Sequence, residues 1–443
     1  MTGQPYDLVG VGIGPFNLAL AALADGVDGV SGLFCDAKPA FSWHPGMLIE
    51  GTTLQVPFLA DLVTLVDPSS RWSFLSYLRE HDRLFPFYFA ERFHVTRREY
   101  DHYCRWVAGA LPSCHFGQRV EAVRADPADG LFVVETIDVH TARRSAARAR
   151  NVVLGVGTEP VVPPPLRDLL DKEVFHSADY LDRVGSLHGA ADVTVIGSGQ
   201  SGAEVFLDLL RRQDGTGSRL RWLTRSPAFA PMEYSKLGLE HFTPDYTRYF
   251  RNLPERTRDA LVPAQWQLYK AISADTIAEI HHTLYERGVG GVRPDVTMTP
   301  NVVVTEARRA AGGVELTCRH IEQETEFTVG TDRVVAATGY APRRPDCLDP
   351  VAGLLDLDTR GRFRVDTDYR VALRPEVGAG LYVQNAEAHT HGVGAPDLGL
   401  GAYRAAVILN AITGRGAYRL PERAAFTTFG TSSTPPHGGD TCP

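Results

Sequence analysis

The sequence predicts an α/β fold with two Rossmann-like units, the second inserted into the first, and a small helical region. Two stretches indicate the units: "YDLVGVGIGPFNLALAALAD" and, about 190 residues later, "ADVTVIGSGQSGAEVFLDLLRR". Each leads from a β-type run through glycines into apolar residues at helical spacing. Residues 231–293 show helical and aromatic patterns without strand signals, which indicates the separate helical region.

Further elements connect these landmarks in order. Residues 31–38 predict a strand ending at Asp36, and residues 69–111 predict mainly helices, with apolar residues three and four positions apart. A β-hairpin is expected around Asp129 and Gly130, and "ARNVVLGVGTEPVVPPP" predicts a buried strand running into a proline-rich connector. Later strands are expected in "LRWLTRS", "NVVVTEA", "GVELTCRH" and "TDRVVAATGYAPRRP".

Composition and charge restrict the class of protein. The chain has 443 residues, 44% of them hydrophobic and 22% charged, which is ordinary for a globular protein with two or three domains. Its formal net charge of -8 disfavours nucleic acid or an anionic membrane as the main partner. We therefore expect a small-molecule substrate, and neither nucleic acid nor membrane as a partner.

Cysteine usage bears on compartment and on metal sites. The six cysteines lie far apart and none forms a CxxC pair, which argues against a dithiol redox centre and a zinc ribbon. This usage fits a reducing compartment. No signal peptide is visible, and no apolar run reaches the roughly 18 residues that a membrane span needs. The sequence therefore predicts a cytoplasmic protein without a metal site.

The first glycine turn, "GVGIGPFN", lies directly after a strand and opens a helix. Glycines there permit a tight turn and the close approach of a pyrophosphate, whose charge is stabilised at the helix N-terminus. Asp36, at the end of the next strand, is placed to accept a hydrogen bond from a ribose hydroxyl. One such turn is weak evidence, because a tight β–α turn without a ligand has the same pattern.

The second turn, "GSGQSGAE" from Gly197 to Glu204, strengthens the case, since two such turns indicate two different dinucleotides. One would be a tightly held flavin and the other a diffusible nicotinamide cofactor. Arg225 follows the next strand, where NAD enzymes usually carry an acid, so a 2′-phosphate and hence NADPH are favoured. A plain surface arginine remains the alternative. Thr338 and Gly339, at a later strand end, could bring backbone close to a cofactor.

The chain resembles the flavin-dependent N-hydroxylating monooxygenases of siderophore biosynthesis, a family of lysine, ornithine and diamine N-monooxygenases. Within that family it is most similar to the putrescine and cadaverine N-hydroxylases. The motifs that carry the resemblance span nearly the whole chain in one order: "DLVGVGIGPFNLALAAL", "FSWHPGM", "LQVPFLADLVT", "SFLSYL", "EYDHYCRWVA", "GSGQSGAEVFLDLL", "FTPDY", "ATGY" and "LGAYRAAVILN".

The resemblance implies an FAD domain, an inserted NADPH domain and a small helical substrate-binding region, assembled as a homodimer or homotetramer. We expect the FAD domain to comprise residues 1–185 and 332–426, and the NADPH domain residues 186–230 and 294–331. The substrate region would be residues 231–293, and residues 427–443 would form a disordered tail.

The cofactor residues follow from the two turns and the resemblance together. Those expected at FAD are Gly10, Gly12, Gly14, Pro15, Asn17, Asp36, Lys38, Trp43, His44, Gln55, Thr338, Gly339 and Leu398. Those expected at NADPH are Gly197, Gly199, Gln200, Ser201, Glu204 and Arg225. Trp43, His44 and Gln55 match the family's segments beside the flavin, and no residue is expected as a catalytic acid or base.

The resemblance also implies the chemistry, an early step of hydroxamate siderophore biosynthesis. NADPH reduces FAD, oxygen adds at flavin C4a, and the terminal amine of the substrate attacks the distal oxygen of the hydroperoxide. The protein supplies position, exclusion of water and an unprotonated amine. An alkylamine has a pKa of about 10.4 in water, and desolvation lowers it.

The stretch "FLADL" departs from the "FLKDL" of ornithine and some lysine hydroxylases, whose lysine pairs with the α-carboxylate of the substrate. Ala60 cannot make that pair, and an unmatched buried carboxylate is unfavourable. Leu239 stands where ornithine enzymes have asparagine, and their Asn-Tyr pair is missing near Lys270 and Ala271. We therefore predict an aliphatic diamine, putrescine or cadaverine. Lysine or ornithine remains the alternative if the carboxylate is anchored elsewhere.

The candidate substrate residues lie in the segment around Ala60 and in the helical region of residues 231–293. They are Gln55, Ala60, Tyr234, Leu239, Glu240 and Lys270, with Trp266 as a lesser candidate. Glu240 is the candidate for the distal ammonium, and a capping or surface acid is its competing interpretation. His389 and His391 have a spacing that suggests a metal, but packing or a place in a flavin-side loop is favoured.

Three other functions fit parts of the pattern. A Baeyer–Villiger or sulfur-oxidising flavin monooxygenase would share both turns, but its "FxGxxxHxxxW" signature between them is not found. A pyridine-nucleotide disulfide reductase is disfavoured by the missing CxxC. A non-enzymatic FAD- and NADPH-binding sensor is distinguished from an enzyme only by turnover.

Overall fold

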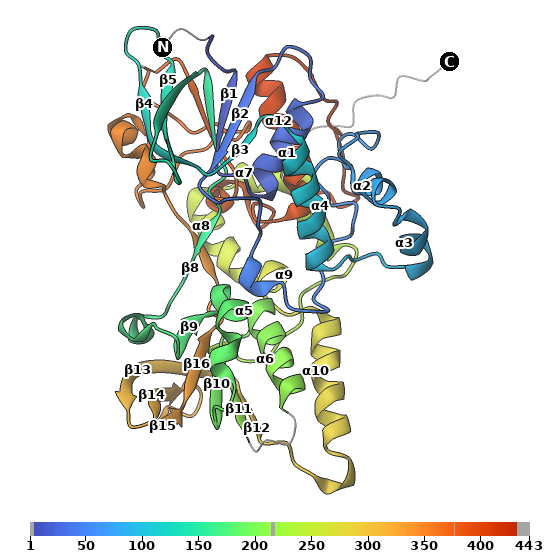
Figure 1. Ribbon diagram of the computed structural model, residues 1–443, viewed down its shortest axis with the longest axis vertical. Coiled ribbons are helices and arrows are strands. Elements are labelled where there is room, and N and C mark those ends of the chain that lie inside the picture. The colour runs from blue at the N-terminus through green and yellow to red at the C-terminus, as the bar shows by residue number, and fades with distance from the viewer. Residues whose placement is uncertain (1–3, 214–217, 376, 432–443) are drawn as a thin grey trace.

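The computed structural model describes residues 4–213, 218–375 and 377–431, and it consists of two sheet-centred units stacked along the long axis (Figure 1). The predicted α/β fold with two parallel sheets is confirmed. The disordered tail expected from residue 427 needs correction at its start, because Thr427 donates to Glu240 and the Phe429 ring packs against Tyr246. From residue 432 on, the expected tail lies outside the described residues. Within the described ranges, no helix is long and apolar enough to cross a membrane.

The first unit is built on a five-stranded parallel sheet in the order β18-β7-β1-β2-β3. Its strands are β1 (Leu8–Val11), β2 (Gly32–Asp36), β3 (Cys114–Phe116), β7 (Asn151–Leu154) and β18 (Gly380–Val383). The central strands are short and apolar because a parallel sheet is covered on both faces. α1 (Pro15–Ala24) packs against α4 (Arg97–Ala110) and α12 (Gly401–Thr413), and nearly all of its residues are buried.

The first unit also carries an antiparallel sheet and several short helices. The expected hairpin around Asp129 and Gly130 joins β4 (Gln118–Ala125) to β5 (Phe132–Asp138), and β6 (Arg144–Ala149) pairs next to β5. The helices are α2 (Phe74–Glu80), α3 (Leu84–Ala90) and α11 (Ala388–His391), and a 3-10 turn, η8, covers Leu398–Leu400. α3 protrudes at the right of the molecule in Figure 1.

The second unit has its own parallel sheet in the order β12-β11-β10-β16-β9. Its strands are β9 (Val174–His176), β10 (Asp192–Ile196), β11 (Arg219–Leu223), β12 (Val296–Thr299) and β16 (Arg333–Ala336). α5 (Tyr180–Arg183), α6 (Gln200–Arg212) and α10 (Ala274–Arg287) lie beside it, and α6 contacts α10 (Figure 1). A second antiparallel sheet is formed by β13 (Val302–Ala310), β14 (Gly313–His320) and β15 (Thr325–Thr331).

The predicted domain boundaries need correction at both ends of the insertion. β9 and β16 belong to the second sheet, whereas boundaries at 185/186 and 331/332 assign both strands to the first unit. The chain passes between the units through β8 (Thr158–Pro160) and β17 (Tyr340–Pro342), which pair antiparallel. The second unit therefore lies between β8 and β17. The error arose because three- and four-residue apolar strands do not reveal which sheet they join.

The predicted helical region of residues 231–293 is also divided. α7 (Pro244–Arg251) and α8 (Glu255–Ala264) contact α11 of the first unit, and α9 (Trp266–Tyr269) follows them in the chain. α10 instead contacts α6 of the second unit. Hydrophobic periodicity identifies a helix but not the surface that the helix will cover, so the region appeared continuous in sequence.

The two units are joined by an apolar segment of the first unit that enters the core of the second. Met47 and Ile49 are buried in the cluster that contains Phe175 and Val195. A Cβ on Gly46 would collide with the carbonyl oxygen of Ala178, so only glycine permits this close approach of the two backbones. The contact between the two units is therefore formed by closely packed backbone and apolar side chains.

Candidate functional site

The first glycine turn has the geometry of an anion-binding site. Gly12 has φ +86, and a Cβ there would lie 2.7 Å from the carbonyl oxygen of Gly155. Gly14 is the N-cap of α1, Pro15 is its first residue, and no described side chain caps this end. The helix N-terminus therefore keeps backbone N–H groups available for a pyrophosphate, and this fits FAD. By contrast, α2, α4, α7 and α10 each begin with a serine or threonine side-chain cap.

Asn17 was expected among the FAD residues, but the structure gives its side chain a different task. It is fully buried, and its Nδ2 donates to the carbonyl oxygens of Gly12 (2.8 Å) and Val153 (3.2 Å). Its Oδ1 accepts from Gln384 Nε2 at 2.8 Å. Asn17 thus ties the turn to β7 and to the end of β18, and its role is to fix the turn that would hold the cofactor.

Asp36 lies at the end of β2, as expected. Its carboxylate accepts hydrogen bonds from the backbone N–H groups of Ile13 (2.8 Å) and Lys38 (2.9 Å). The Lys38 ammonium lies 3.6 Å from the same carboxylate and donates to the Ser42 carbonyl oxygen at 3.0 Å. The acid is therefore fixed beside the turn, where a ribose hydroxyl would reach it.

The second turn repeats this arrangement in the second unit. Gly197 has φ +113, and a Cβ there would collide with the carbonyl oxygen of Ala337. Gly199 is the N-cap of α6, again without a side-chain cap, and Gln200 and Ser201 form the first helical positions. Arg225 follows β11 and is exposed, so its guanidinium is accessible to a phosphate group. These features fit a second dinucleotide.

Trp43 and His44 lie where the first unit meets the second. Their rings pack edge-on at 5.2 Å between centroids, and His44 also contacts the ring of Tyr340 at 5.3 Å. Burial, together with the charges of Arg97 and Lys38, lowers the pKa of His44 to about 4. His44 is therefore neutral at neutral pH and does not add positive charge to this region.

The segment with Gln55 and Ala60, which is expected near the substrate, contacts the helical insertion. Tyr234 donates through its hydroxyl to the Gln55 carbonyl oxygen at 2.9 Å, so the helical insertion touches this segment. Ala60 is buried, and a Cβ built on Gly399 would lie 4.0 Å from the Ala60 methyl and 2.7 Å from Asp397 Oδ1. Asp397 therefore lies on the side of the segment that Ala60 faces.

Asp397 is a residue that the sequence interpretation missed, although the neighbouring Leu398 was named. Its carboxylate accepts from the Gly399 N–H at 2.7 Å and caps η8. Burial raises the pKa of Asp397 to about 6. The pKa of Tyr234 is also raised, mainly by the burial of Tyr234 itself and further by the charge of Asp397. The available signal was an acid in "APDLGL" ahead of a glycine-rich helix start, which resembles an ordinary cap.

Glu240 does not fit its expected place at the substrate ammonium. Both of its oxygens accept backbone hydrogen bonds, from Phe426 (2.9 Å) and Thr427 (2.8 Å). A hydrogen bond from the Thr427 side chain, together with these two backbone hydrogen bonds, holds the pKa of Glu240 below its usual value. Glu240 thus fastens the C-terminal segment, as the capping interpretation proposed. The adjacent Leu239 is half-buried, and its backbone N–H donates to the Ser235 carbonyl oxygen at 2.9 Å.

Other expected residues lie near one of the two turns. The Lys270 carbonyl oxygen would be 3.3 Å from a Cβ on Gly199, so Lys270 borders the second turn while its side chain is exposed. Thr338 donates to the carbonyl oxygen of Val161, and Gly339 has φ +87. Both lie between the units, whereas Leu398 packs half-buried against the first core.

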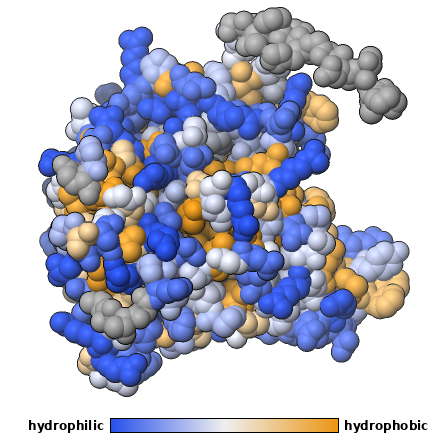
Figure 2. Space-filling model, turned by 90° about the horizontal axis from the view of Figure 1, so that it is seen from above, coloured by the Kyte–Doolittle hydropathy of each residue, from blue (hydrophilic) through white to orange (hydrophobic). Residues whose placement is uncertain are grey.

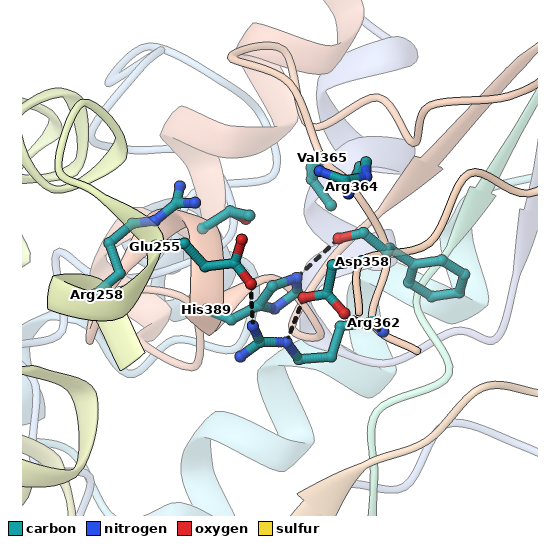
Figure 3. Close-up of a pocket in the computed structure, with 9 residues that line it drawn as sticks. Glu255, Arg258, Asp358, Arg362, Arg364, Val365 and His389 are labelled. Carbon is teal, nitrogen blue, oxygen red and sulfur yellow. Dashed lines mark hydrogen bonds and ion pairs between the residues drawn. The ribbon is translucent and has the colours of Figure 1, made fainter. Parts of the chain in front are cut away.

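His389 and His391, whose spacing suggests a metal site, both have partners within the protein. His389 Nε2 lies 2.7 Å from the Phe363 carbonyl oxygen, and His391 stacks on Tyr369 at 4.3 Å. Figure 3 shows His389 at a cavity of ≈ 150 Å³ where Arg362 is paired with Asp358 and Glu255. None of the expected site residues lines this cavity, and its charges are largely paired among themselves.

Comparisons with known proteins find relatives over the part of the chain that contains both glycine turns. The family model for L-lysine 6-monooxygenase/L-ornithine 5-monooxygenase matches residues 4–342. The rhizobactin siderophore biosynthesis protein RhbE of Rhizobium meliloti is 46% identical over 97% of this chain and 96% of its own length. The putrescine N-hydroxylase of Shewanella oneidensis is 41% identical over 96% of this chain and 84% of its own length.

A solved structure extends the similarity to three dimensions. The FAD-bound cadaverine monooxygenase DfoA of the desferrioxamine pathway, from Erwinia amylovora, is 38% identical with a TM-score of 0.94. The match covers 98% of this chain and 100% of that one. The chain belongs to the L-lysine 6-monooxygenase/L-ornithine 5-monooxygenase family.

Proposed function

We propose that this protein hydroxylates a terminal primary amine of an aliphatic diamine, putrescine or cadaverine, in hydroxamate siderophore biosynthesis. FAD binds at the first glycine turn, NADPH binds at the second, and O2 is the co-substrate. The observation that carries the proposal is the combination of Ala60 with the neighbouring Asp397. The alternative is L-lysine N6- or L-ornithine N5-hydroxylation, as in other members of the family.

Charge decides between these substrates. A lysine or ornithine substrate brings an α-carboxylate, which needs a cation, but position 60 is an alanine. Asp397, on the side that Ala60 faces, would repel a carboxylate and pair with an ammonium group. A diamine presents an ammonium at the end that is not hydroxylated. The site therefore selects for the functional group that distinguishes diamines from amino acids.

The chain's own residues supply position and an apolar setting. Bound FAD supplies the activation of oxygen, which no amino-acid side chain provides. Asp397 holds the distal ammonium, so that the other amine extends along the wall formed by Gln55 and its neighbours. Burial along this wall favours the neutral form of the reacting amine, which must carry a lone pair. His44, which is neutral at neutral pH, adds no further positive charge to this region.

The test of the function is product formation with the FAD-loaded protein and NADPH across putrescine, cadaverine, lysine and ornithine. Hydroxylamine product is measured together with NADPH oxidation, oxygen uptake and peroxide release. We expect product from one or both diamines, with oxidation coupled to hydroxylation. Coupled product from lysine or ornithine alone would refute the diamine assignment. Peroxide without product from any amine would mean that the substrate lies outside this panel.

Replacement of Ala60 by lysine tests the charge argument directly. In Ala60→Lys the new ammonium pairs with Asp397 and displaces the substrate ammonium, so kcat/KM for the diamine should fall about 100-fold. Ala60→Met is the matched control, since it adds similar bulk without charge and should lose far less. Steady-state hydroxylation at several diamine concentrations measures both variants. Equal losses in the two would show that size rather than charge matters at this position.

We also propose that the protein is a homo-oligomer that acts in the cytoplasm. The support for assembly is α3, which has no buried residue and exposes Phe85 (76%), Tyr88 (71%) and Phe89 (75%). Exposed apolar side chains are also visible where this part of the molecule protrudes in Figure 2. A helix that is apolar on several faces is normally covered. Light scattering on wild type and on Phe85→Ser/Phe89→Ser measures whether loss of these aromatic side chains lowers the molecular mass of the assembly.

A further inference from the structure

Glu204 combines deep burial with an incomplete set of hydrogen bonds. It lies on α6, one turn after the second glycine turn, and is 3% exposed. Its Oε1 lies 3.1 Å from Arg97 Nη2 and accepts from Gln200 Nε2 at 2.9 Å. Its Oε2 is buried and has no hydrogen-bond partner among the described residues. A buried carboxylate oxygen without a donor is unfavourable, so a donor from outside the chain is expected there.

The position of Arg97 shows which part of the molecule Glu204 faces. Arg97 is the first residue of α4 in the first unit, and its Nε donates to the Thr53 carbonyl oxygen at 3.4 Å. Thr53 lies two residues before Gln55, in the segment expected near the substrate. The charge of Arg97 also acts on His44 and Tyr340. Glu204 therefore lies at the junction of the two units, beside the groups expected near the flavin.

The direction of a dinucleotide on the second turn brings a donor to this point. The pyrophosphate lies at the N-terminus of α6, and the adenosine end extends toward the end of β11, where Arg225 is placed for the 2′-phosphate. The nicotinamide half must then extend away from Arg225, toward the first unit, if it is to reduce a flavin there. Its carboxamide carries an N–H2 group, the only strong neutral donor on the nicotinamide ring.

We propose that Glu204 binds the nicotinamide half of NADPH, with Oε2 accepting a hydrogen bond from the carboxamide N–H2. Arg97 is the positioning residue, because it neutralises the carboxylate and holds it at the junction. This inference rests on the proposed NADPH site and adds to it a recognition element distinct from Arg225. It makes the orientation of the nicotinamide depend on an ion pair that joins the two units.

Binding to the FAD-loaded protein tests the proposal without turnover. Calorimetric titrations of wild type and Glu204→Gln use NADP⁺, 2′,5′-ADP, which lacks the nicotinamide half, and 3-acetylpyridine adenine dinucleotide phosphate. The last compound has a methyl group in place of the carboxamide N–H2. We expect Glu204→Gln to weaken NADP⁺ binding about tenfold, since the charge-assisted hydrogen bond is lost. Affinity for 2′,5′-ADP and for the acetylpyridine analogue should change less than about twofold.

Arg225→Ala is the matched control, because it should weaken all three ligands by a similar factor. Equal weakening of all three by Glu204→Gln would instead mean that Glu204 only supports the fold of the turn, and the proposal would be wrong. Unchanged NADP⁺ binding would also overturn it. A wild type that binds none of the three would refute the NADPH site itself, which separates that failure from a failure of the Glu204 assignment.

Discussion

The two glycine turns share one local geometry but are embedded differently. α1, behind the first turn, is buried on almost every face, and Asn17 and Asp36 tie its turn to three strands. α6, behind the second turn, keeps a polar face, and the exposed Arg225 follows the strand beside its turn. We therefore expect a ligand at the first turn to be retained and a ligand at the second turn to exchange. This difference suits a resident flavin and a diffusible nicotinamide cofactor.

Breaking the first turn should have the largest effect. Gly12→Val places a branched Cβ in a left-handed conformation, 2.7 Å from a backbone oxygen that cannot move freely. The combined strain and overlap amount to about 2–5 kcal/mol. We expect purified Gly12→Val to contain little or no FAD, as measured by its absorbance after gel filtration. Retention of stoichiometric FAD would contradict the assignment of this turn.

The same change at the second turn should separate the two cofactors. Gly197→Ala brings a Cβ against the Ala337 carbonyl oxygen, also with φ in the left-handed region. We expect normal FAD content but at least about a tenfold slower reduction of the flavin by NADPH under anaerobic conditions. Dithionite reduces the flavin without using this turn and serves as the control. A loss of FAD in this variant would show that the second turn does not act independently.

Arg225 offers a smaller and more specific change. Arg225→Ala removes an exposed charge that the 2′-phosphate would contact, without a packed neighbour to disturb. Preference for NADPH over NADH, measured as the ratio of kcat/KM values, should fall about tenfold through weaker NADPH use. NADH kinetics provide the internal reference and should change little. An unaltered ratio would support the interpretation of Arg225 as a plain surface arginine.

Much of this comparison could be predicted from the sequence because its signals are local. A strand, closely spaced glycines and an apolar helix occur within about 20 residues, and backbone geometry leaves few structures that satisfy such a pattern. Ala60 was informative for the same reason, since its place within "FLADL" is fixed by neighbours. Asp36 and Arg225 follow from the parallel register of the strand next to each turn.

The remaining parts depend on contacts between distant segments. Asn17 faces the sheet instead of the cofactor because it meets Val153 and Gln384, more than a hundred residues away. Glu240 was assigned to the substrate because nothing in its own segment reveals the backbone N–H groups of residues 426 and 427. The role of Arg97 was not predicted, because in sequence it is one of two adjacent arginines at a helix start and nothing there indicates its ion pair with Glu204. Sequence spacing cannot show which acids are already paired.

The smallest expected effect is a pH dependence that belongs to the substrate site alone. Burial raises the pKa of Asp397 to about 6, so the carboxylate loses its charge as the pH falls through that value and holds a diamine ammonium less well. Between pH 7.5 and 5.5 the ionised fraction falls roughly fourfold, and KM for the diamine should rise by about the same factor. KM for NADPH is measured in parallel as the reference. In Asp397→Asn the KM for the diamine should be high at both pH values, because no charge remains to be lost. A diamine KM that still rises at low pH in this variant would place the titrating group elsewhere, and Asp397 would then be only the cap of η8.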